Sequence, residues 1–172
     1  MADKNQAIID FLLTCPTISG NPLYFNFLNA KDKNKQVITQ ANDTALNRNF
    51  VDGSVLKRYT FTIIDFRSVA YDAVPINTVI PGTTTYTEYV SQNVETFDDV
   101  QNIIDWINEQ ADEQNYPDFG EECFIDSMRT TSTNPNLNGV DTSVAPALAK
   151  YSISIEIDYL DNTKSIWNQE EN

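Results

Sequence analysis

The most regular hydrophobic pattern of the chain lies between residues 150 and 159. Polar and apolar residues alternate there without an exception, and the apolar set is Tyr151, Ile153, Ile155, Ile157 and Tyr159. Strict alternation places every apolar side chain on one face of an extended strand. The segment Lys150–Tyr159 is therefore predicted to be an antiparallel strand with one buried face and one face in water.

A second long strand is predicted over Lys57–Val69. Its first apolar residues share one face: Tyr59, Phe61 and Ile63. The apolar positions then change parity, to Ile64 and Phe66. An extra residue in a strand moves the side chains that follow it to the opposite face. We therefore expect a β-bulge in this strand.

Two helices are predicted from apolar residues that return every three or four positions. The first runs from about Asp3 to Thr14, with Asp3 and Gln6 as a capping box. The second runs from about Phe97 to Gln114, with Thr96 and Asp99 as a capping pair. Its apolar stripe consists of Phe97, Val100, Ile103, Ile104, Ile107 and Ala111.

Shorter elements complete the pattern. Leu23–Ala30 is strand-like, and Lys35–Gln40 could return beside it as the second arm of a hairpin. The polar stretch 42–53 is predicted to be a loop with some local packing. Cys123–Thr131 is predicted to be a strand, and Thr133–Pro146, rich in Asn, Thr and Pro, a long loop.

The segment between the second long strand and the second helix has no clear period. It contains Pro75, Pro81, Gly82, three consecutive threonines and little charge. A connection of this length inside a compact domain is usually functional or ordered by a partner. We therefore expect an extended arm or β-hairpin over residues 70–95.

Together these elements predict an α+β fold with a mainly antiparallel sheet, two helices packed on one face and a long extended loop or hairpin. The length of 172 residues, 41% of them hydrophobic, fits a single domain. We expect that domain to span residues 1–160. A polar C-terminal tail is expected over residues 161–172, where it frays or docks on a neighbour.

Charge and targeting signals narrow the function classes. Eleven basic against twenty-five acidic residues give a formal net charge of −14, which repels phosphate. Specific nucleic-acid binding is therefore disfavoured, although Lys31, Lys33 and Lys35, or Lys57 with Arg58, could form a local basic patch. Apolar runs of only a few residues and the start of the chain predict neither a membrane span nor a signal peptide.

The sequence contains no recognisable arrangement of catalytic residues. The chain has no histidine, which removes His-dependent nucleophilic triads and nearly all zinc sites. Cys15 and Cys123 are expected to be reduced structural thiols, although the sequence does not exclude a disulfide. No phosphate-binding glycine motif is present, and the adjacent carboxylates have structural explanations. We therefore expect no enzymatic activity, no cofactor and no metal.

What remains is surface suited to contact with other proteins. Two long loops of low charge and a tail with an apolar tip exceed what a small monomer requires, although they could also be ordinary solvated loops. The candidate subunit-interface residues are Val79, Ile80, Tyr86, Tyr89, Val90, Leu137, Val140, Ile166 and Trp167.

The order of the elements resembles that of a known family. It combines a short helix ending near Cys15, the long strand Lys57–Ile63, the helix Phe97–Ile107 and the closing strand Ala149–Tyr159. In this layout the chain resembles the tail terminator proteins of long-tailed bacteriophages, also called tail completion or minor capsid proteins. The segment 71–94 is long for that family.

The resemblance implies a structural virion protein at the head-proximal end of the tail, assembled in the host cytoplasm. Such a protein forms a homohexameric ring that caps the tail tube, ends its polymerisation and provides the docking surface for the head connector. Its partners would be other copies of itself, the major tail tube protein and a head–tail connector or completion protein. DNA would pass through an acidic ring without specific binding, because carboxylates repel phosphates.

Two other readings stay open at this point. The chain could be a different virion protein of similar size, such as another head–tail joining or completion protein or a baseplate component. It could also be a non-viral acidic module that binds a basic protein.

Overall fold

The alternating segment near the end of the chain forms the centre of a sheet. In the computed structural model, which describes residues 3–21, 23–26, 35–69, 74–78, 86–90 and 93–165, it becomes β8 (Ala147–Asp161). β8 pairs antiparallel with β3 (Val55–Val69) over the full length of both strands and without a register shift. The predicted alternation is confirmed, because the side chains at odd positions from 147 to 161 are buried.

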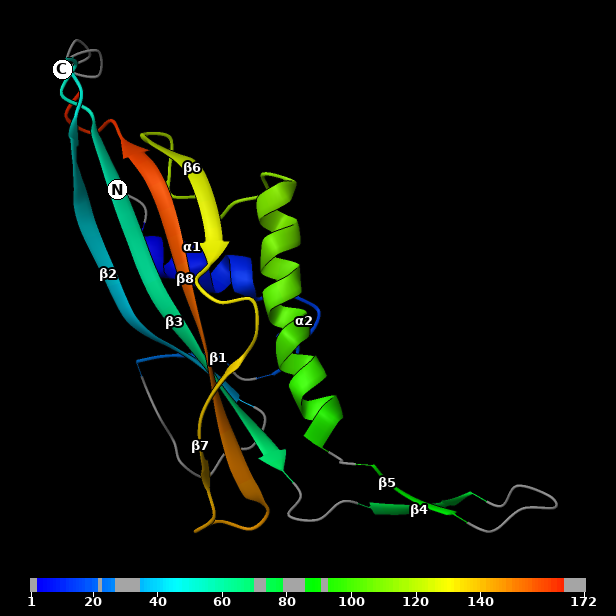
Figure 1. Cartoon of the computed structure of the whole chain (residues 1–172). Helices are drawn as coiled ribbons and strands as arrows, with labels where there is room; N and C mark the ends of the chain where they lie inside the picture. The colour runs from blue at the N-terminus through cyan, green and yellow to red at the C-terminus, as the bar shows by residue number, and fades with distance from the viewer. Residues whose placement is uncertain are drawn as a thin grey trace.

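Further strands flank this central pair (Figure 1). The sheet has six strands in the order β1–β2–β3–β8–β6, and β7 pairs with β8 along the same edge as β6. The flanking strands are β1 (Leu23–Phe25), β2 (Lys35–Asn49), β6 (Cys123–Thr130) and β7 (Asn136–Asp141). Apart from the parallel pair β1–β2, all pairs are antiparallel.

Two helices bury their apolar stripes against one face of the sheet. α1 (Lys4–Leu12) and α2 (Asn93–Asp112) share a single core with the inward side chains of β3 and β8. The largest side chains with almost no exposure are Tyr159, Ile8, Leu12, Ile18, Ile38, Ile63, Ile103, Ile104, Ile107, Ile153 and Ile155. The structure is therefore an α+β domain.

The predicted helix caps are only partly correct. Asp3 does cap α1, since its Oδ1 accepts the N–H of Asn5 at 3.0 Å. Gln6 does not complete a capping box, because its side chain donates to Asp10. α2 begins at Asn93 rather than Phe97, so the predicted cap at Thr96 lies inside the helix.

Two segments predicted to be loops or hairpin arms are strands in another arrangement. β1 and β2 run parallel, so they are not the two arms of a hairpin, and β2 extends to Asn49 through the stretch predicted to be a loop. Similarly, β7 lies inside the predicted loop Thr133–Pro146 and all six of its residues are exposed. Both strands form because β3 and β8 offer backbone hydrogen-bonding groups along their edges, which need partners whatever the side-chain pattern.

The chain after β8 packs on the turn between β2 and β3. Ser165 is buried, and its hydroxyl lies 3.3 Å from Oδ2 of Asp52. Gly53 has a φ of +89°, and a Cβ there would lie 2.6 Å from the carbonyl oxygen of Lys164. Residues 162–165 therefore dock on the domain, whereas the rest of the predicted tail lies outside the described residues.

The junction at Asp161 predicts how stability depends on pH. Burial alone would raise the pKa of Asp161, but hydrogen bonds from Lys57 and Thr163 outweigh it and lower the pKa from 3.8 to about 2. The Lys57 Nζ lies 2.6 Å from this carboxylate. A lowered folded-state pKa contributes stability that is complete above the unfolded pKa and is lost as pH falls towards the folded value.

We therefore expect the unfolding midpoint to fall as the pH drops from about 5 to 2, and the Asp161→Asn variant to lose less across that window. Thermal unfolding followed by circular dichroism at a series of pH values measures both slopes. The exposed Glu121→Gln variant serves as the control, with the wild-type slope. Parallel curves for wild type and Asp161→Asn would contradict this expectation.

Candidate functional site

The buried face of β3 includes two charged residues near the end of the strand. Side chains facing the core alternate without a break through Tyr59, Phe61, Ile63, Asp65 and Arg67. The predicted β-bulge is wrong, because β3 keeps one register with β8 throughout. The sequence suggested a change of parity because the residues that follow on the outer face are apolar, whereas those on the buried face are charged.

These two residues belong to an ion cluster, formed by Gln36, Asp65, Arg67 and Asp99, in which the first three residues are buried and the Asp99 side chain is exposed. Asp65 has no exposed surface and Arg67 is 7% exposed. Arg67 Nε lies 3.0 Å from both carboxylate oxygens of Asp65, and Gln36 Nε2 donates to the same group at 3.3 Å. Arg67 Nη1 donates to Asp99 on α2 at 3.1 Å. The sequence signal for this cluster was a pair of opposite charges two positions apart in a strand.

Burial and ion pairing act in opposite directions on the Asp65 carboxyl. Burial raises the pKa of Asp65, while the charge and hydrogen bond of Arg67 and the hydrogen bond of Gln36 oppose the rise. An ion pair in this setting contributes little net stability, because desolvation offsets the attraction. The ion cluster joins the end of β3 to the second turn of α2.

The ion cluster stands at the base of the predicted arm. β3 ends at Val69 and α2 begins at Asn93, and between them the structure describes β4 (Val74–Thr78) and β5 (Tyr86–Val90). The two strands pair antiparallel, from Val74 opposite Val90 to Thr78 opposite Tyr86. They form a separate two-stranded sheet that does not join the six-stranded one.

The candidate interface residues fall into three groups. The backbone of Tyr86, Tyr89 and Val90 lies on β5. Leu137 and Val140 lie on β7, with 51% and 45% of their surface exposed. The remaining four, Val79, Ile80, Ile166 and Trp167, lie outside the described residues.

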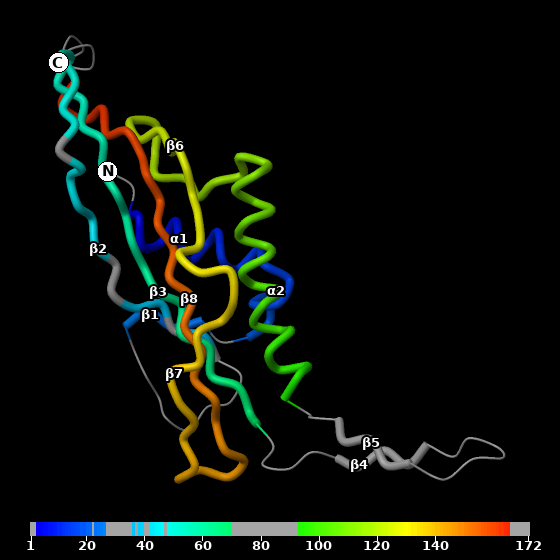
Figure 2. Tube along the Cα trace, viewed as in Figure 1, coloured from blue at the N-terminus to red at the C-terminus, as the bar shows by residue number. Residues whose placement is uncertain are grey.

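A bulge brings the two apolar residues of β7 onto one face. Leu137 lies opposite Tyr151 and Val140 opposite Ala149, with a register shift between them. Tyr151 and Ala149 both face the core, so Leu137 and Val140 both point to the side of the sheet that carries the helices. Without the bulge, an odd-numbered and an even-numbered residue would point to opposite faces of the strand. Gly139 permits the bulge, because its φ of +147° is unfavourable for other residues. Figure 2 shows β7 running beside the start of β8.

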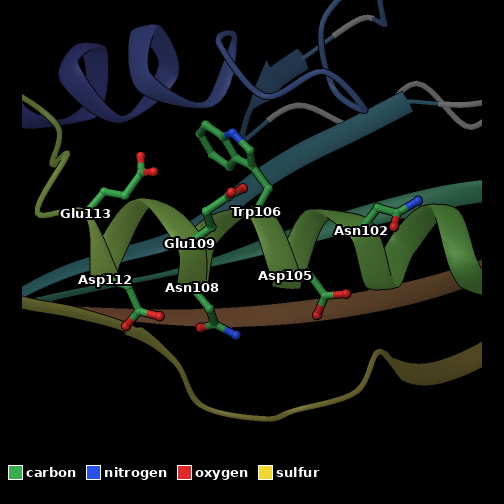
Figure 3. Close-up of a pocket in the computed structure, with 7 residues that line it drawn as sticks. All are labelled: Asn102, Asp105, Trp106, Asn108, Glu109, Asp112 and Glu113. Carbon is green, nitrogen blue, oxygen red and sulfur yellow. The ribbon is translucent and has the colours of Figure 1, made fainter.

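The outer side of α2 carries an acidic hollow of about 690 Å³ (Figure 3). Trp106, Glu109 and Glu113 project from one side of the helix, and Asp105 and Asp112 from the other. The carboxylates are spread along the helix rather than directed at one point. This surface can attract a basic partner, but it does not assemble a catalytic group.

A second polar network fixes α1 to the sheet and was not predicted. Tyr159 donates to both carboxylate oxygens of Asp43 at 2.7 and 2.8 Å, and Lys4 Nζ lies 2.7 Å from Asp43 Oδ2. Lys4 also contacts the Tyr159 hydroxyl. Burial, followed by the hydrogen bond to Asp43, raises the pKa of Tyr159, which keeps the phenol protonated. A phenol held in this state does not serve as a base at neutral pH.

Metal and membrane features can be stated for the part of the chain that the structure describes. Cys15 and Cys123 are free thiols. Among the residues with described positions, no group of three or more His, Cys, Asp or Glu side chains is arranged to hold a metal ion. Neither α1 nor α2 is long and apolar enough to cross a membrane.

Comparison of the chain with models of known protein families and with curated proteins finds no match. Its function must therefore be inferred from the geometry of its own surface.

The ion cluster predicts a specific pattern of stability changes. We expect Arg67→Met to lower the free energy of unfolding by about 3–5 kcal/mol, because it leaves the Asp65 carboxylate buried without its cation. Adding Asp65→Asn should restore much of the loss, since Asn keeps an acceptor for Gln36 and removes the unpaired charge. Denaturant unfolding followed by fluorescence of Trp106, which packs on Phe11, measures both.

The matched control is Arg58→Met, in the same strand but on the outer face. Arg58 pairs with Asp158 at 2.6 Å and is partly exposed, so its loss should cost at most about 1 kcal/mol. Equal losses for the two arginine variants would show that burial of the cluster has no special role.

Proposed function

We propose that this chain is a structural virion protein of the tail terminator type. In this role it is one subunit of a ring that caps the tail tube, ends tube polymerisation and provides the docking surface between the tail and the head connector. The observation that supports this most directly is the β4–β5 sheet, a hairpin inserted between β3 and α2 that joins no strand of the domain's main sheet.

An isolated two-stranded hairpin is only marginally stable in water and gains stability by packing on another surface. This hairpin begins after β3 and ends before α2, and the Arg67 contacts to Asp65 and Asp99 hold those two elements together. The anchored base favours an arm with a defined direction. An arm that contacts a different patch on the next copy makes a head-to-tail interface, which closes into a ring when the rotation allows.

The charge of the chain is consistent with this role. A ring of six copies with a net charge of −14 each would surround DNA with negative potential. The DNA would then pass through the ring without binding to its wall, because the carboxylates repel the phosphates. The partners in this proposal are further copies of the chain, the tail tube protein and the head connector, at the head-proximal end of the tail. Another joint protein of the virion would share these properties, and only its position in the particle would differ.

A second candidate function is supported by the acidic hollow on α2. Asp105, Glu109, Asp112 and Glu113 line it beside Trp106, a composition that suits a basic protein segment. In that case the chain would act as an acidic binding module and would form a salt-sensitive complex with one basic partner.

The ring proposal predicts the behaviour of the purified chain with tail tubes. We expect the chain, added to polymerising tail tube protein of the same phage, to stop tube growth and to appear as a ring at one tip in negative stain. The ring released from the tube should have a mass of about 117 kDa, six times the 19.5 kDa of one chain. Tube lengths from electron micrographs and the mass from light scattering are the measurements.

The control is a variant in which residues 74–90 are replaced by a flexible Gly-Ser linker. Because β4 and β5 belong to a separate sheet, the domain should keep its unfolding midpoint but neither form the ring nor shorten the tubes. Tubes of unchanged length with the intact chain would reject the terminator role. A salt-sensitive one-to-one complex with a polylysine probe under the same conditions would favour the acidic module.

A further inference from the structure

β7 offers an open backbone edge at the side of the main sheet. It pairs with β8 along one edge, and no strand among the described residues pairs with the other. All six residues are exposed, and none from Asn136 to Val140 is charged. The bulge adds two exposed apolar side chains, Leu137 and Val140, on one face. An edge of this kind is a template for another strand.

The other edges of the same sheet are less suited to accept a strand: β6 and β2 contain more charged residues than β7, and the outer strand β1 has only three residues. β6 has a register shift between Ile125 and Ser127, and the charged residues Asp126 and Arg129 lie along it. β2 beyond its short pairing with β1 has two register shifts and includes Asp43 and Arg48. Charged residues and very short strands are two of the devices that prevent strand addition. Because β7 also has a register shift, the charges rather than the bulges distinguish these edges. β7 is therefore the edge best suited to accept one.

The β4–β5 hairpin is suited to donate the strand. Pro75 has no N–H group, and a proline within a sheet is normally placed with its nitrogen on the unpaired side. The outer edge of β4 then lacks the donor at position 75, whereas β5 contains no proline and keeps all its N–H groups. β5 has five residues against the six of β7, and its only charged residue is Glu88. A third strand would also stabilise the hairpin itself.

We propose that β5 of one copy pairs with the open edge of β7 in the next copy. The inference rests on the proposed ring, for which it names the contact between subunits. The hairpin does not make this contact within its own chain, because β4 and β5 form a sheet separate from the one that contains β7. Donor and acceptor are different patches, so the contact is head-to-tail and each subunit uses both.

Cross-linking between two singly substituted chains tests the pairing. Thr87→Cys on β5 and Asn138→Cys on β7 are each made in a Cys123→Ser background, which leaves only the fully buried Cys15. The two variants are mixed, allowed to assemble on tail tubes and treated with a short bismaleimide. We expect a covalent dimer from the mixture and less than about a tenth as much from either variant alone, because pairing brings residues from different copies together.

Matched acceptor variants show whether the edge is specific. Thr44→Cys on β2 and Phe124→Cys on β6 are exposed positions on the competing edges and leave the charged residues of those edges in place. Each should give at most about a tenth of the Asn138 product when mixed with Thr87→Cys, because those edges carry more charged residues. Cross-linking at β2 or β6 equal to that at β7 would overturn the proposal.

Hydrogen exchange of the unsubstituted chain provides a test that does not depend on the variants. Amides of residues 136–141 should exchange at least about tenfold more slowly in the assembled protein than in the dilute subunit, because a new ladder protects them. An assembled ring without this protection and without the 87–138 cross-link would reject the pairing while leaving the ring intact. A chain that stays monomeric on tubes would reject the pairing and the proposed function together.

Discussion

The antiparallel pairing of β3 with β8 is the constraint on which the rest of the structure depends. Both strands run from one end of the domain to the other in a single register, so every inward side chain of one has a fixed neighbour on the other. The resulting apolar face is what α1 and α2 cover. The two outer edges of the pair provide the backbone groups that order β2, β6 and β7. A change of register would therefore move the helices and the edges together.

The same pairing determines where charge can be buried. Because the side chains of β3 alternate without a break, Asp65 and Arg67 follow Ile63 on the inward face. They are buried there, away from water, and require hydrogen-bonding or charged partners. Gln36 and Asp99 supply these partners from β2 and α2. An apolar pair would fill this space at lower electrostatic cost. The charged pair instead specifies which turn of α2 sits at the end of β3, and so fixes the base of the hairpin.

The sequence predicted the elements whose pattern follows from burial and missed those whose formation follows from pairing. The alternation around Ile155 and the helical stripe around Ile104 could be recognised without knowing which elements lie beside them. In each case the spacing of the apolar residues indicates the buried face of the element. β7 and the second half of β2 have no such face, and backbone hydrogen bonds to a neighbouring strand order them. The ion cluster was missed for a related reason: Asp65 resembles a solvent-facing residue until Arg67 and Asp99 are placed beside it. The predicted interface residues on β7 came together only through the bulge at Gly139.

The net charge also bears on how copies of this chain can associate. Subunits with a charge of −14 repel one another at any distance within the screening length of the solvent, so attraction between them must be short-ranged. Backbone hydrogen bonds and apolar contacts satisfy this requirement, whereas acidic surfaces such as the outer side of α2 oppose contact. The strands β5 and β7 combine open backbone with a low density of charge. In a ring of acidic subunits, strands with few charges would therefore face each other, and the carboxylates would remain at the lumen and the outer surface.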